Sequence, residues 1–366
     1  MKQRGLNICL LLAILISCEL GFIHSQNKGD QNILLGAYYF DGWTLNSPHI
    51  TPILRKSYRE REPKWGWVTS SQNIIDKQIL EASNAGLAFF SFCWYTNNEN
   101  QTNVLNNALQ LFHKSKYNSR LKFCLLVANH EGSYITPENW EHCTDQWIKE
   151  FASKQYLKVD EKPLIIFFSI ENLIKMFGSP GAVKLAFDSF RSKALKGGLH
   201  GLSIAGCVTT TSTSLSLSEQ CGFNLVTGYN YHGSAFHGQK QKIPIDSMQT
   251  TEYKVWNFMS QWSRLPYIPV STLNWDPRPW ANERNGYNEA HYFVGYSQKS
   301  VYKSVSQIID WLKNNPKNTP KERIGLLYAW NENGEGAYLT PSRNGDNMLK
   351  GVTKALHSPI TSSQKP

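Results

Sequence analysis

The chain has 366 residues, a formal net charge of +10 at pH 7 and 41% hydrophobic residues. Its lysines are scattered, and the densest basic stretches, at 240–242 and 313–321, are mixed with Asn, Gln and Pro as in solvated loops. This distribution excludes a basic stripe for nucleic acid, so we expect no nucleic-acid partner. The length is that of a globular protein and suits one large barrel domain.

The first 25 residues have the pattern of an export signal. Lys2 and Arg4 precede an apolar core from Ile8 to Ile16, followed by small and polar residues. The segment 15–18 also fits a lipoprotein cleavage box in which Cys18 would be lipidated; ordinary cleavage near residue 25 is the alternative. We therefore expect an exported, periplasmic or cell-surface protein that contacts a membrane only through such a lipid anchor.

Five cysteines follow the signal segment: Cys93, Cys124, Cys143, Cys207 and Cys221. Their spacing fits neither a disulfide framework nor a zinc site. Most lie in apolar runs, so we expect small core residues, and export leaves one disulfide possible.

Short apolar runs alternate with longer amphipathic segments along the chain. The strand candidates are 33–40, 87–93, 121–128, 163–169, 201–207, 223–229, 267–273 and 323–329. Eight such units predict an α/β fold, a (β/α)8 TIM barrel formed as a single domain over residues 31–358. An open doubly wound sheet is the alternative, but no G-x-G-x-x-G follows the first strand.

Two of the intervening segments carry clear helix signals. Residues 71–85 place Ile75, Ile79 and Ala82 on one face and stop at Gly86. A second helix is predicted to begin with Thr136 as N-cap and to align Trp140, Cys143, Trp147 and Phe151 in a stripe. By contrast, residues 209–218 are predicted to be a flexible polar loop.

Aromatic and polar residues close most of the predicted strands. In a barrel these ends meet at one face, where active sites lie. Aromatic faces interspersed with carboxylates and amides suit the ring faces and hydroxyls of a carbohydrate. The predicted substrate-binding residues are Tyr38, Tyr39, Asp41, Trp43, Trp94, Tyr95, Asn129, Glu131, Tyr229, Tyr231, His232, Trp275, Asp276, Arg278, Trp330, Asn331 and Tyr338. Trp280 is a further candidate stacking face. Histidines here lack H-E-x-x-H spacing, so we expect no metal and no cofactor.

The segment 323–341 is the most informative stretch. An uncharged apolar run ends in Glu332 and Glu335, enclosed by Gly334 and Gly336. A turn or one helical coil would bring both carboxylates to one face, where they would repel and raise one pKa. The pair is therefore a candidate catalytic base and acid. The structural alternative is a solvated rim beside a turn.

These residues resemble the glycoside hydrolase family 99-like group, which includes endo-α-mannosidase-type enzymes and WbsX-like proteins. Residues 329–341 are similar to the A-W-N-E-W-G-E-G-x-x-L-x-P signature of the WbsX-like branch. Residues 275–278, Trp-Asp-Pro-Arg, look like a shortened W-D-x-x-P-R stretch, and 128–129 a weaker A-N-E-x-W segment.

The resemblance implies that Glu332 is the base that deprotonates the sugar 2-hydroxyl, whose oxygen attacks the anomeric carbon. It implies that Glu335 is the acid that protonates the leaving oxygen. Two positions differ from the N-E-W-H-E-G form of family 99: Asn333 replaces Trp, and Gly334 replaces His but matches the WbsX-like branch. These differences bear on a mannose substrate more than on the mechanism.

Three functions follow from this reading. The first is an exported, monomeric, retaining glycoside hydrolase acting on a polysaccharide or glycan. The second is a glycosyltransferase, although export away from nucleotide sugars and the lack of a D-x-D segment argue against it. The third is a non-catalytic glycan-binding lipoprotein, which would keep the aromatic residues but would not need both glutamates.

Overall fold

The computed structural model describes residues 33–97, 102–236, 238 and 241–357. These residues lie within one compact unit, Asn32–Pro366. The predicted signal peptide and Cys18 lie outside the described residues. Within the described part of the chain, no helix is both long enough and apolar enough to cross a membrane.

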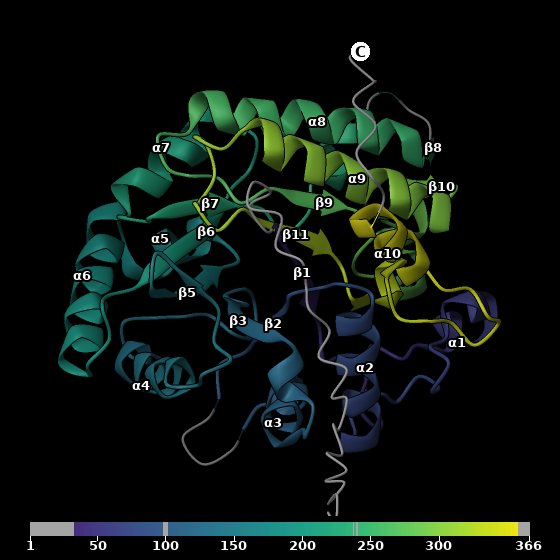
Figure 1. Ribbon diagram of the computed structural model, residues 1–366, viewed down its shortest axis with the longest axis horizontal. Coiled ribbons are helices and arrows are strands. Elements are labelled where there is room, and N and C mark those ends of the chain that lie inside the picture. The colour runs from purple at the N-terminus through teal and green to yellow at the C-terminus, as the bar shows by residue number, and fades with distance from the viewer. Residues whose placement is uncertain (1–32, 98–101, 237, 239–240, 358–366) are drawn as a thin grey trace, which may run out of the picture. The chain divides into compact units, whose positions relative to one another are not determined.

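Eight parallel strands form the centre of the protein, and the predicted (β/α)8 barrel is confirmed (Figure 1). The strands are β1 (Leu34–Tyr39), β2 (Phe89–Trp94), β3 (Lys122–Val127), β5 (Lys162–Phe167), β6 (Ser203–Cys207), β7 (Leu225–Thr227), β9 (Val270–Thr272) and β11 (Ile324–Tyr328). Their order around the sheet is β7-β6-β5-β3-β2-β1-β11-β9. Nearly all strand residues are buried, as expected for parallel strands covered by helices on one side and filled on the other.

The barrel closes between β7 and the segment leading into β9. Val226 and Tyr267 form a single parallel bridge. The amide of Ile268 donates to the carbonyl of Val226 at 2.9 Å. Pro269, which has no N–H, follows immediately. Regular pairing therefore stops there, and the predicted strand over 267–273 is shortened to β9.

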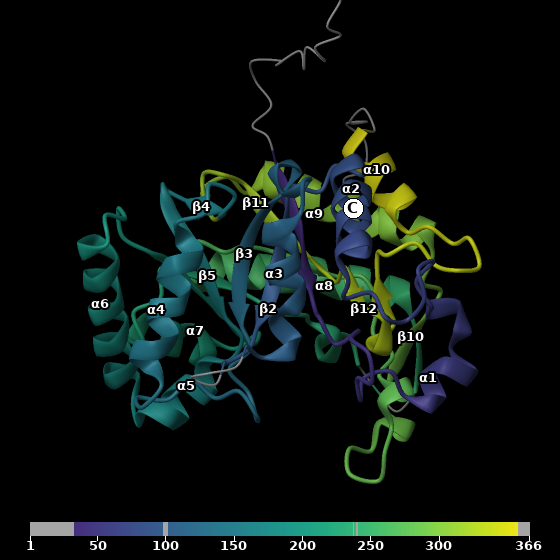
Figure 2. The same ribbon diagram turned by 90° about the horizontal axis from the view of Figure 1, so that it is seen from below.

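Helices surround the strands (Figures 1 and 2). They are α1 (Pro52–Ser57), α2 (Gln72–Asn84), α3 (Asn107–Lys114), α4 (Trp140–Phe151), α5 (Ile170–Phe177), α6 (Pro180–Lys196), α7 (Ser212–Gln220), α8 (Ile245–Trp262), α9 (Gln298–Asn314) and α10 (Leu349–His357). Outside the barrel, β4 (Lys158–Val159) pairs with β5, β8 (Lys242–Pro244) with β10 (Tyr292–Val294), and β12 (Asn331–Glu332) with β13 (Ala337–Tyr338). Short 3-10 turns lie at η1 (Arg59–Arg61), η2 (Val104–Asn106), η3 (Asn118–Arg120), η4 (His232–Ala235), η5 (Arg278–Trp280), η6 (Tyr287–Glu289) and η7 (Asn333–Glu335).

The apolar stripes of α2 and α4 are confirmed, because every predicted stripe residue is buried. The predicted start of α4 is wrong: the helix begins at Trp140 with Asn139 as its N-cap residue. The side chain of Asn139 accepts from the amide of Thr136 at 2.9 Å. This bond closes a turn over 136–139, so the proline at 137 belongs to the turn and not to the helix.

The polar segment after β6 is also corrected, because it forms helix α7 and not a loop. The Thr211 side chain accepts from the amide of Ser214 and caps the helix. Leu215 and Ser218 are buried in its inner face. Serine-rich composition had concealed a helix that depends on its cap and on tertiary packing.

The five cysteines of the described residues are all buried and unpaired, which confirms the prediction of core residues. Within these residues, no group of three His, Cys, Asp or Glu side chains is arranged to hold a metal ion.

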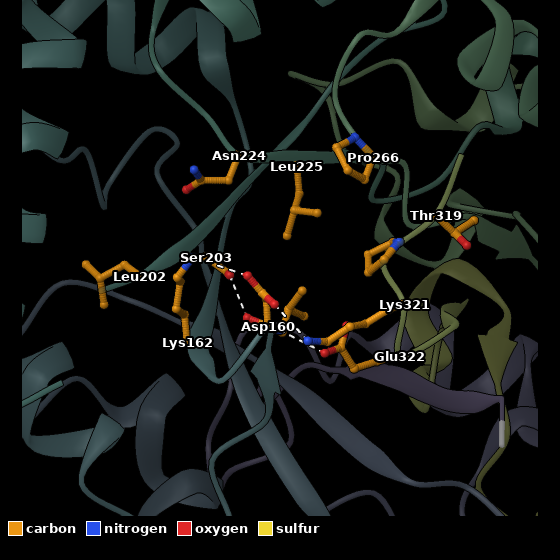
Figure 3. Close-up of a pocket in the computed structure, with 12 residues that line it drawn as sticks. Asp160, Lys162, Leu202, Ser203, Asn224, Leu225, Pro266, Thr319, Lys321 and Glu322 are labelled. Atoms are coloured by element: carbon orange, nitrogen blue, oxygen red, sulfur yellow. Dashed lines mark hydrogen bonds and ion pairs between the residues drawn. The ribbon is translucent and has the colours of Figure 1, made fainter. Parts of the chain in front are cut away.

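The amino-terminal end of the barrel holds a cavity of about 350 Å³ (Figure 3). It lies beneath the starts of β5, β6 and β7, at the opposite end from Glu332. Asp160 accepts from Lys162 at 3.3 Å and from Lys321 at 2.8 Å, and its amide donates to Glu322 at 2.8 Å. The charged groups at this end thus pair mainly with one another.

A buried carboxylate supports the closing strand β9. Glu252 on α8 is fully buried. It accepts from the amide of Thr272, and its other oxygen accepts from the Ser271 hydroxyl at 2.9 Å. Because β7 ends at Thr227, no described strand pairs with the Thr272 amide on that side, and the Glu252 carboxylate accepts its hydrogen bond instead. Burial raises the pKa of Glu252 from 4.5 to about 7, although these hydrogen bonds lower it.

A carboxyl group whose pKa is higher in the folded state binds its proton more tightly there, so its contribution to stability falls as pH rises. For Glu252 this loss spans pH 4.5 to 7 and amounts to roughly 3 kcal/mol at most. Glu252→Gln keeps an acceptor for Thr272 and removes the titration. We expect urea unfolding to show a smaller loss of stability between pH 5 and pH 8 than in the wild type. Equal losses would contradict this, and the exposed Glu283→Gln is the control.

Candidate active site at the carboxyl end of the barrel

The two glutamates lie on a short turn that leaves the end of β11. After Tyr328 the chain forms β12, the 3-10 turn η7 and β13, with Glu332 opposite Ala337 in an antiparallel pair. Gly336 closes the turn at a φ of 72°, a left-handed conformation that favours glycine. The predicted turn is confirmed. It brings the two glutamates, which are three residues apart in the sequence, to the mouth of the barrel.

Glu332 is buried and has one hydrogen-bond partner on its carboxylate. The hydroxyl of Tyr229, which follows β7, donates to its Oε1. Its Oε2 has no protein partner among the described residues. Burial raises the pKa of Glu332 to about 7, and the hydrogen bond from Tyr229 lowers it. The tyrosine therefore favours the ionised form of this carboxyl group.

Glu335 differs because no side chain or amide of the described residues donates to its carboxyl group. Burial raises its pKa to about 8. Its backbone carbonyl accepts from the amide of Asp276 at 2.7 Å, so the main chain is fixed while the carboxyl group is not. Burial, and not the predicted repulsion between the glutamates, is the cause of both raised pKa values.

A row of aromatic rings leads away from Glu332. Tyr229 contacts Phe168 with ring centroids 5.2 Å apart, Phe168 contacts His130 at 5.8 Å, and His130 contacts Tyr95 at 5.7 Å. Tyr229, Phe168 and His130 are each partly exposed. The row offers apolar faces beside the carboxyl group, as a sugar ring requires.

A second aromatic group follows β7 and β9. His232 stacks on Trp275 with the rings 3.7 Å apart and 5° from parallel. Burial lowers the pKa of His232 to about 4, so this imidazole is neutral at pH 7. Trp275 is 9% exposed, and His232 covers one of its faces.

Trp280 lies directly on the turn between the two glutamates. A Cβ atom added to Gly334 would come within 2.0 Å of its indole ring. The indole N–H donates to the carbonyl of His49 at 3.0 Å, which fixes the ring over the turn. Gly334 is therefore required by the close approach of Trp280.

Three predicted tryptophan contacts are corrected, because these rings are buried in the supporting structure. Trp330 is fully buried and donates to Gln78 of α2 at 2.6 Å. Trp94 packs against Trp147 of α4 at 5.3 Å. Trp43 is 1% exposed. Trp330 and Trp94 pack against helices behind the strand ends, and all three rings are too buried for a sugar to stack on them.

Several polar candidates are likewise engaged in structural hydrogen bonds. Asp41 accepts from the amide of Ala108 at 2.5 Å in the first turn of α3. Asn129 exchanges hydrogen bonds with the backbone of Ser169 at 2.6 and 2.9 Å. Asn331 does the same with Phe40, at 2.6 and 2.8 Å. Asn129 and Asn331 hold neighbouring strand ends together, and Asp41 holds the start of α3. All three side chains are buried and are not open to the predicted substrate contact.

The other predicted residues divide between the interior and the surface. Tyr38 is buried inside the barrel and donates to Gly228 across it at 2.6 Å. Tyr39, Tyr231 and Tyr338 are buried, Asp276 and Arg278 pair with each other, and Glu131 is exposed. Of the predicted set, Tyr229 contacts Glu332 directly, Tyr95 lies near enough to both glutamates for their charges to raise its pKa after burial, and Asp276 bonds the Glu335 main chain.

Sequence reasoning missed three neighbours of the pair. The Cys93 thiol lies 3.9 Å from the Tyr229 hydroxyl, and burial followed by the charge of Glu332 raises its pKa. Tyr287 lies near enough to Glu335 for that charge, after burial, to raise its pKa. Phe168 completes the aromatic row. Cys93 and Phe168 had been assigned to apolar strand runs, and Tyr287 lies in a long connection with no local signal.

The fold and this site define an α/β barrel protein with two closely spaced glutamates at its carboxyl-terminal mouth, Glu332 buried and Glu335 partly exposed. The chain belongs to the family described as glycosyltransferase WbsX, whose model matches residues 40–352. The protein is therefore a member of a carbohydrate-active family. A search of curated proteins by sequence finds no match.

Solved structures share the fold at low identity. A glycoside hydrolase-like protein is 15% identical with a TM-score of 0.61, over 90% of this chain and 95% of its own. The GH99 endo-alpha-mannosidase from Bacteroides thetaiotaomicron, in complex with BIS-TRIS-propane, is 14% identical with a TM-score of 0.59, over 89% and 97%. The endoglucanase Cel5A from Pseudomonas stutzeri is 12% identical with a TM-score of 0.50, over 90% and 95%.

The contact between Gly334 and Trp280 gives a direct test of the turn. Gly334→Ala places a methyl group in the volume of the indole, and we expect a loss of about 1 to 3 kcal/mol in urea unfolding. Trp280→Ala should relieve much of this loss in the double variant. Gly233→Ala, where an added Cβ would meet nothing within 4 Å, is the control and should change little. Independent, additive losses would show that the two residues do not meet.

Proposed function

We propose that the protein is an exported retaining glycoside hydrolase that uses Glu332 as base and Glu335 as acid. The observation that carries this proposal is the unequal environment of the two glutamates. Glu332 accepts from a tyrosine hydroxyl, which favours its ionised form, whereas no described residue donates to the Glu335 carboxyl group, so its protonated form is favoured. Two neighbouring carboxyl groups whose environments push their pKa values apart are suited to acid and base work at one site.

In the proposed first step, Glu332 takes the proton of the sugar 2-hydroxyl, and the freed oxygen attacks the anomeric carbon. The bond to the leaving oxygen breaks as Glu335 gives that oxygen its proton. Water then opens the 1,2-anhydro sugar at the anomeric carbon, with Glu335 taking the water proton and Glu332 returning a proton to the 2-oxygen. Both glutamates end in their starting states, and two displacements give retention.

A glycosyltransferase is the second candidate, favoured by the family description. The export signal predicted over residues 1–25 supports hydrolysis, because activated nucleotide sugars are largely cytoplasmic. The two functions separate in one assay. Purified protein is incubated with a panel of polysaccharides, α-mannan included, and with nucleotide sugars plus the same acceptors. Release of reducing ends without a nucleotide sugar supports the hydrolase, whereas transfer dependent on a nucleotide sugar supports the transferase.

The glutamate assignment predicts two different patterns of loss. Glu335→Gln removes the acid of the first step, so kcat/KM for a polysaccharide should fall on the order of 100-fold, while kcat/KM for an activated aryl glycoside falls far less. Glu332→Gln removes the base and should slow both substrates alike. Near-wild-type turnover by either folded variant would contradict the assignment and favour a non-catalytic glycan-binding protein.

Tyr229 should determine the pH at which the catalytic rate falls on the acidic side of its pH profile. Its hydroxyl lowers the pKa of Glu332, so Tyr229→Phe should raise that pKa and move the acidic limb upward by roughly one pH unit. The alkaline limb, which reflects Glu335, should move less, although both limbs belong jointly to the pair. Tyr156→Phe, which removes a buried hydroxyl bonded to Leu164, is the control. An unmoved acidic limb would exclude Tyr229 from this role.

A further inference from the structure

Each residue of the turn from Asn333 to Gly336 is hydrogen-bonded to the side chain or the backbone of Arg61, Asn274 or Asp276. The Asn333 side chain donates to the carbonyl of Arg61 at 2.7 Å. The Gly334 carbonyl accepts from the Arg61 guanidinium at 3.4 Å. The Glu335 carbonyl accepts from the Asp276 amide at 2.7 Å. The Gly336 carbonyl accepts from Asn274 at 2.8 Å.

Arg61 is the centre of this arrangement, although 215 residues separate it from Asp276 along the chain. Its side chain is 7% exposed. One guanidinium nitrogen donates to the Asp276 carboxylate, and the other donates to the Asp276 carbonyl at 3.1 Å as well as to Gly334. The guanidinium lies 4.3 Å from the Tyr58 ring centroid. Only the planar fork of arginine can reach these acceptors together, because a lysine has a single nitrogen.

The charge of Asp276 is balanced on its other side by Arg278, which donates to both carboxylate oxygens at 2.7 and 2.9 Å. Arg278 in turn lies 3.3 Å from the Tyr292 ring centroid. Burial raises the pKa of Asp276, but the hydrogen bonds and charges of the two arginines outweigh it and leave that pKa below its ordinary value. Asp276 is thus a fixed anion beneath the turn.

We propose that Arg61, acting through Asp276 and the backbone of Asn333–Glu335, is the positioning residue for the carboxyl group of Glu335. Neither Arg61 nor Asp276 contacts that carboxyl group, so neither is a catalytic residue. They fix the main chain from which the carboxyl group projects, and a misplacement of about 1 Å at such a group can slow a reaction strongly. This proposal rests on the proposed function, since it gives Glu335 its role as acid.

The test compares Arg61→Met and Arg61→Lys with Arg191→Met. Arg191 is a matched control far from the site: it donates to Asp188 at 3.1 Å and to the carbonyl of Gly222 at 2.6 Å. Hydrogen exchange followed by mass spectrometry should show about 10-fold faster exchange over 330–338 in both Arg61 variants. The Arg191 variant should leave that segment unchanged. Equal exchange in all three proteins would overturn the proposal, whatever reaction the protein catalyses.

The kinetic arm uses the polysaccharide cleaved in the panel and the 2,4-dinitrophenyl glycoside of its sugar. Arg61→Met should lower kcat on the polysaccharide about 10-fold or more, with the KM for the polysaccharide and kcat/KM for the aryl glycoside changed less than about 2-fold. Arg61→Lys should not restore the rate. A loss confined to KM, or equal for both substrates, would overturn the positioning role.

Glu335→Gln measured in parallel separates the two claims. If that variant stays active, the proposed function fails; if it is inactive while Arg61→Met matches the control, only the positioning role fails. Should Arg61→Met not fold, Asn333→Ala removes only the hydrogen bond from Asn333 to the Arg61 carbonyl. This variant should give smaller changes in the exchange rate over 330–338 and in kcat. Unchanged exchange and rate in that variant would count against the proposal.

Discussion

Removal of the Glu332 carboxyl group from water, and partial removal of the Glu335 carboxyl group, at the end of β11 is the constraint on which the rest of the site depends. A carboxylate loses favourable hydration on burial, so its protonated form gains in relative stability. The barrel supplies this burial because β11 is enclosed on both faces and ends in a hairpin that returns over the mouth. A solvated rim, the alternative expected for two glutamates near a turn, would not raise either pKa.

The partners of each carboxyl group then decide how it behaves. Asp276 has two arginines and is a stable anion. Glu332 has one tyrosine, and Glu335 has no donor among the described residues. Asp276 follows β9, and the two glutamates follow the adjacent strand, β11. Asp276 holds the main chain of the turn, whereas Glu332 and Glu335 remain titratable. Because Arg61 and Arg278 balance the charge of Asp276, this fixed anion can lie beneath the turn that carries the two titratable glutamates.

The strands could be predicted from sequence because each is an uninterrupted apolar run between polar segments. The direction in which each side chain points at a strand end could not be predicted from the sequence. In β2, Cys93 reaches toward Tyr229 while the adjacent Trp94 packs against Trp147 of α4. Composition favoured the tryptophan as a sugar contact, although alternation along the strand placed the cysteine beside the site. The contact between Arg61 and Asp276 had no local signal at all, since it depends on how the barrel closes.

A raised pKa alone does not identify the functional carboxyl groups. Burial raises the pKa of Asp41 and of Glu252 to about 7, as it does for Glu332. Both oxygens of Glu252 accept hydrogen bonds that hold β9, and Asp41 lies at the start of α3, where a carboxylate is stabilised by the helix amides. Among the described residues, the carboxyl group of Glu335 has neither kind of partner, and it lies at the barrel mouth next to a second carboxyl group and partly exposed rings. The combination of burial, few donors and position at the strand ends, and not the pKa, distinguishes the proposed proton donor from the structural acids.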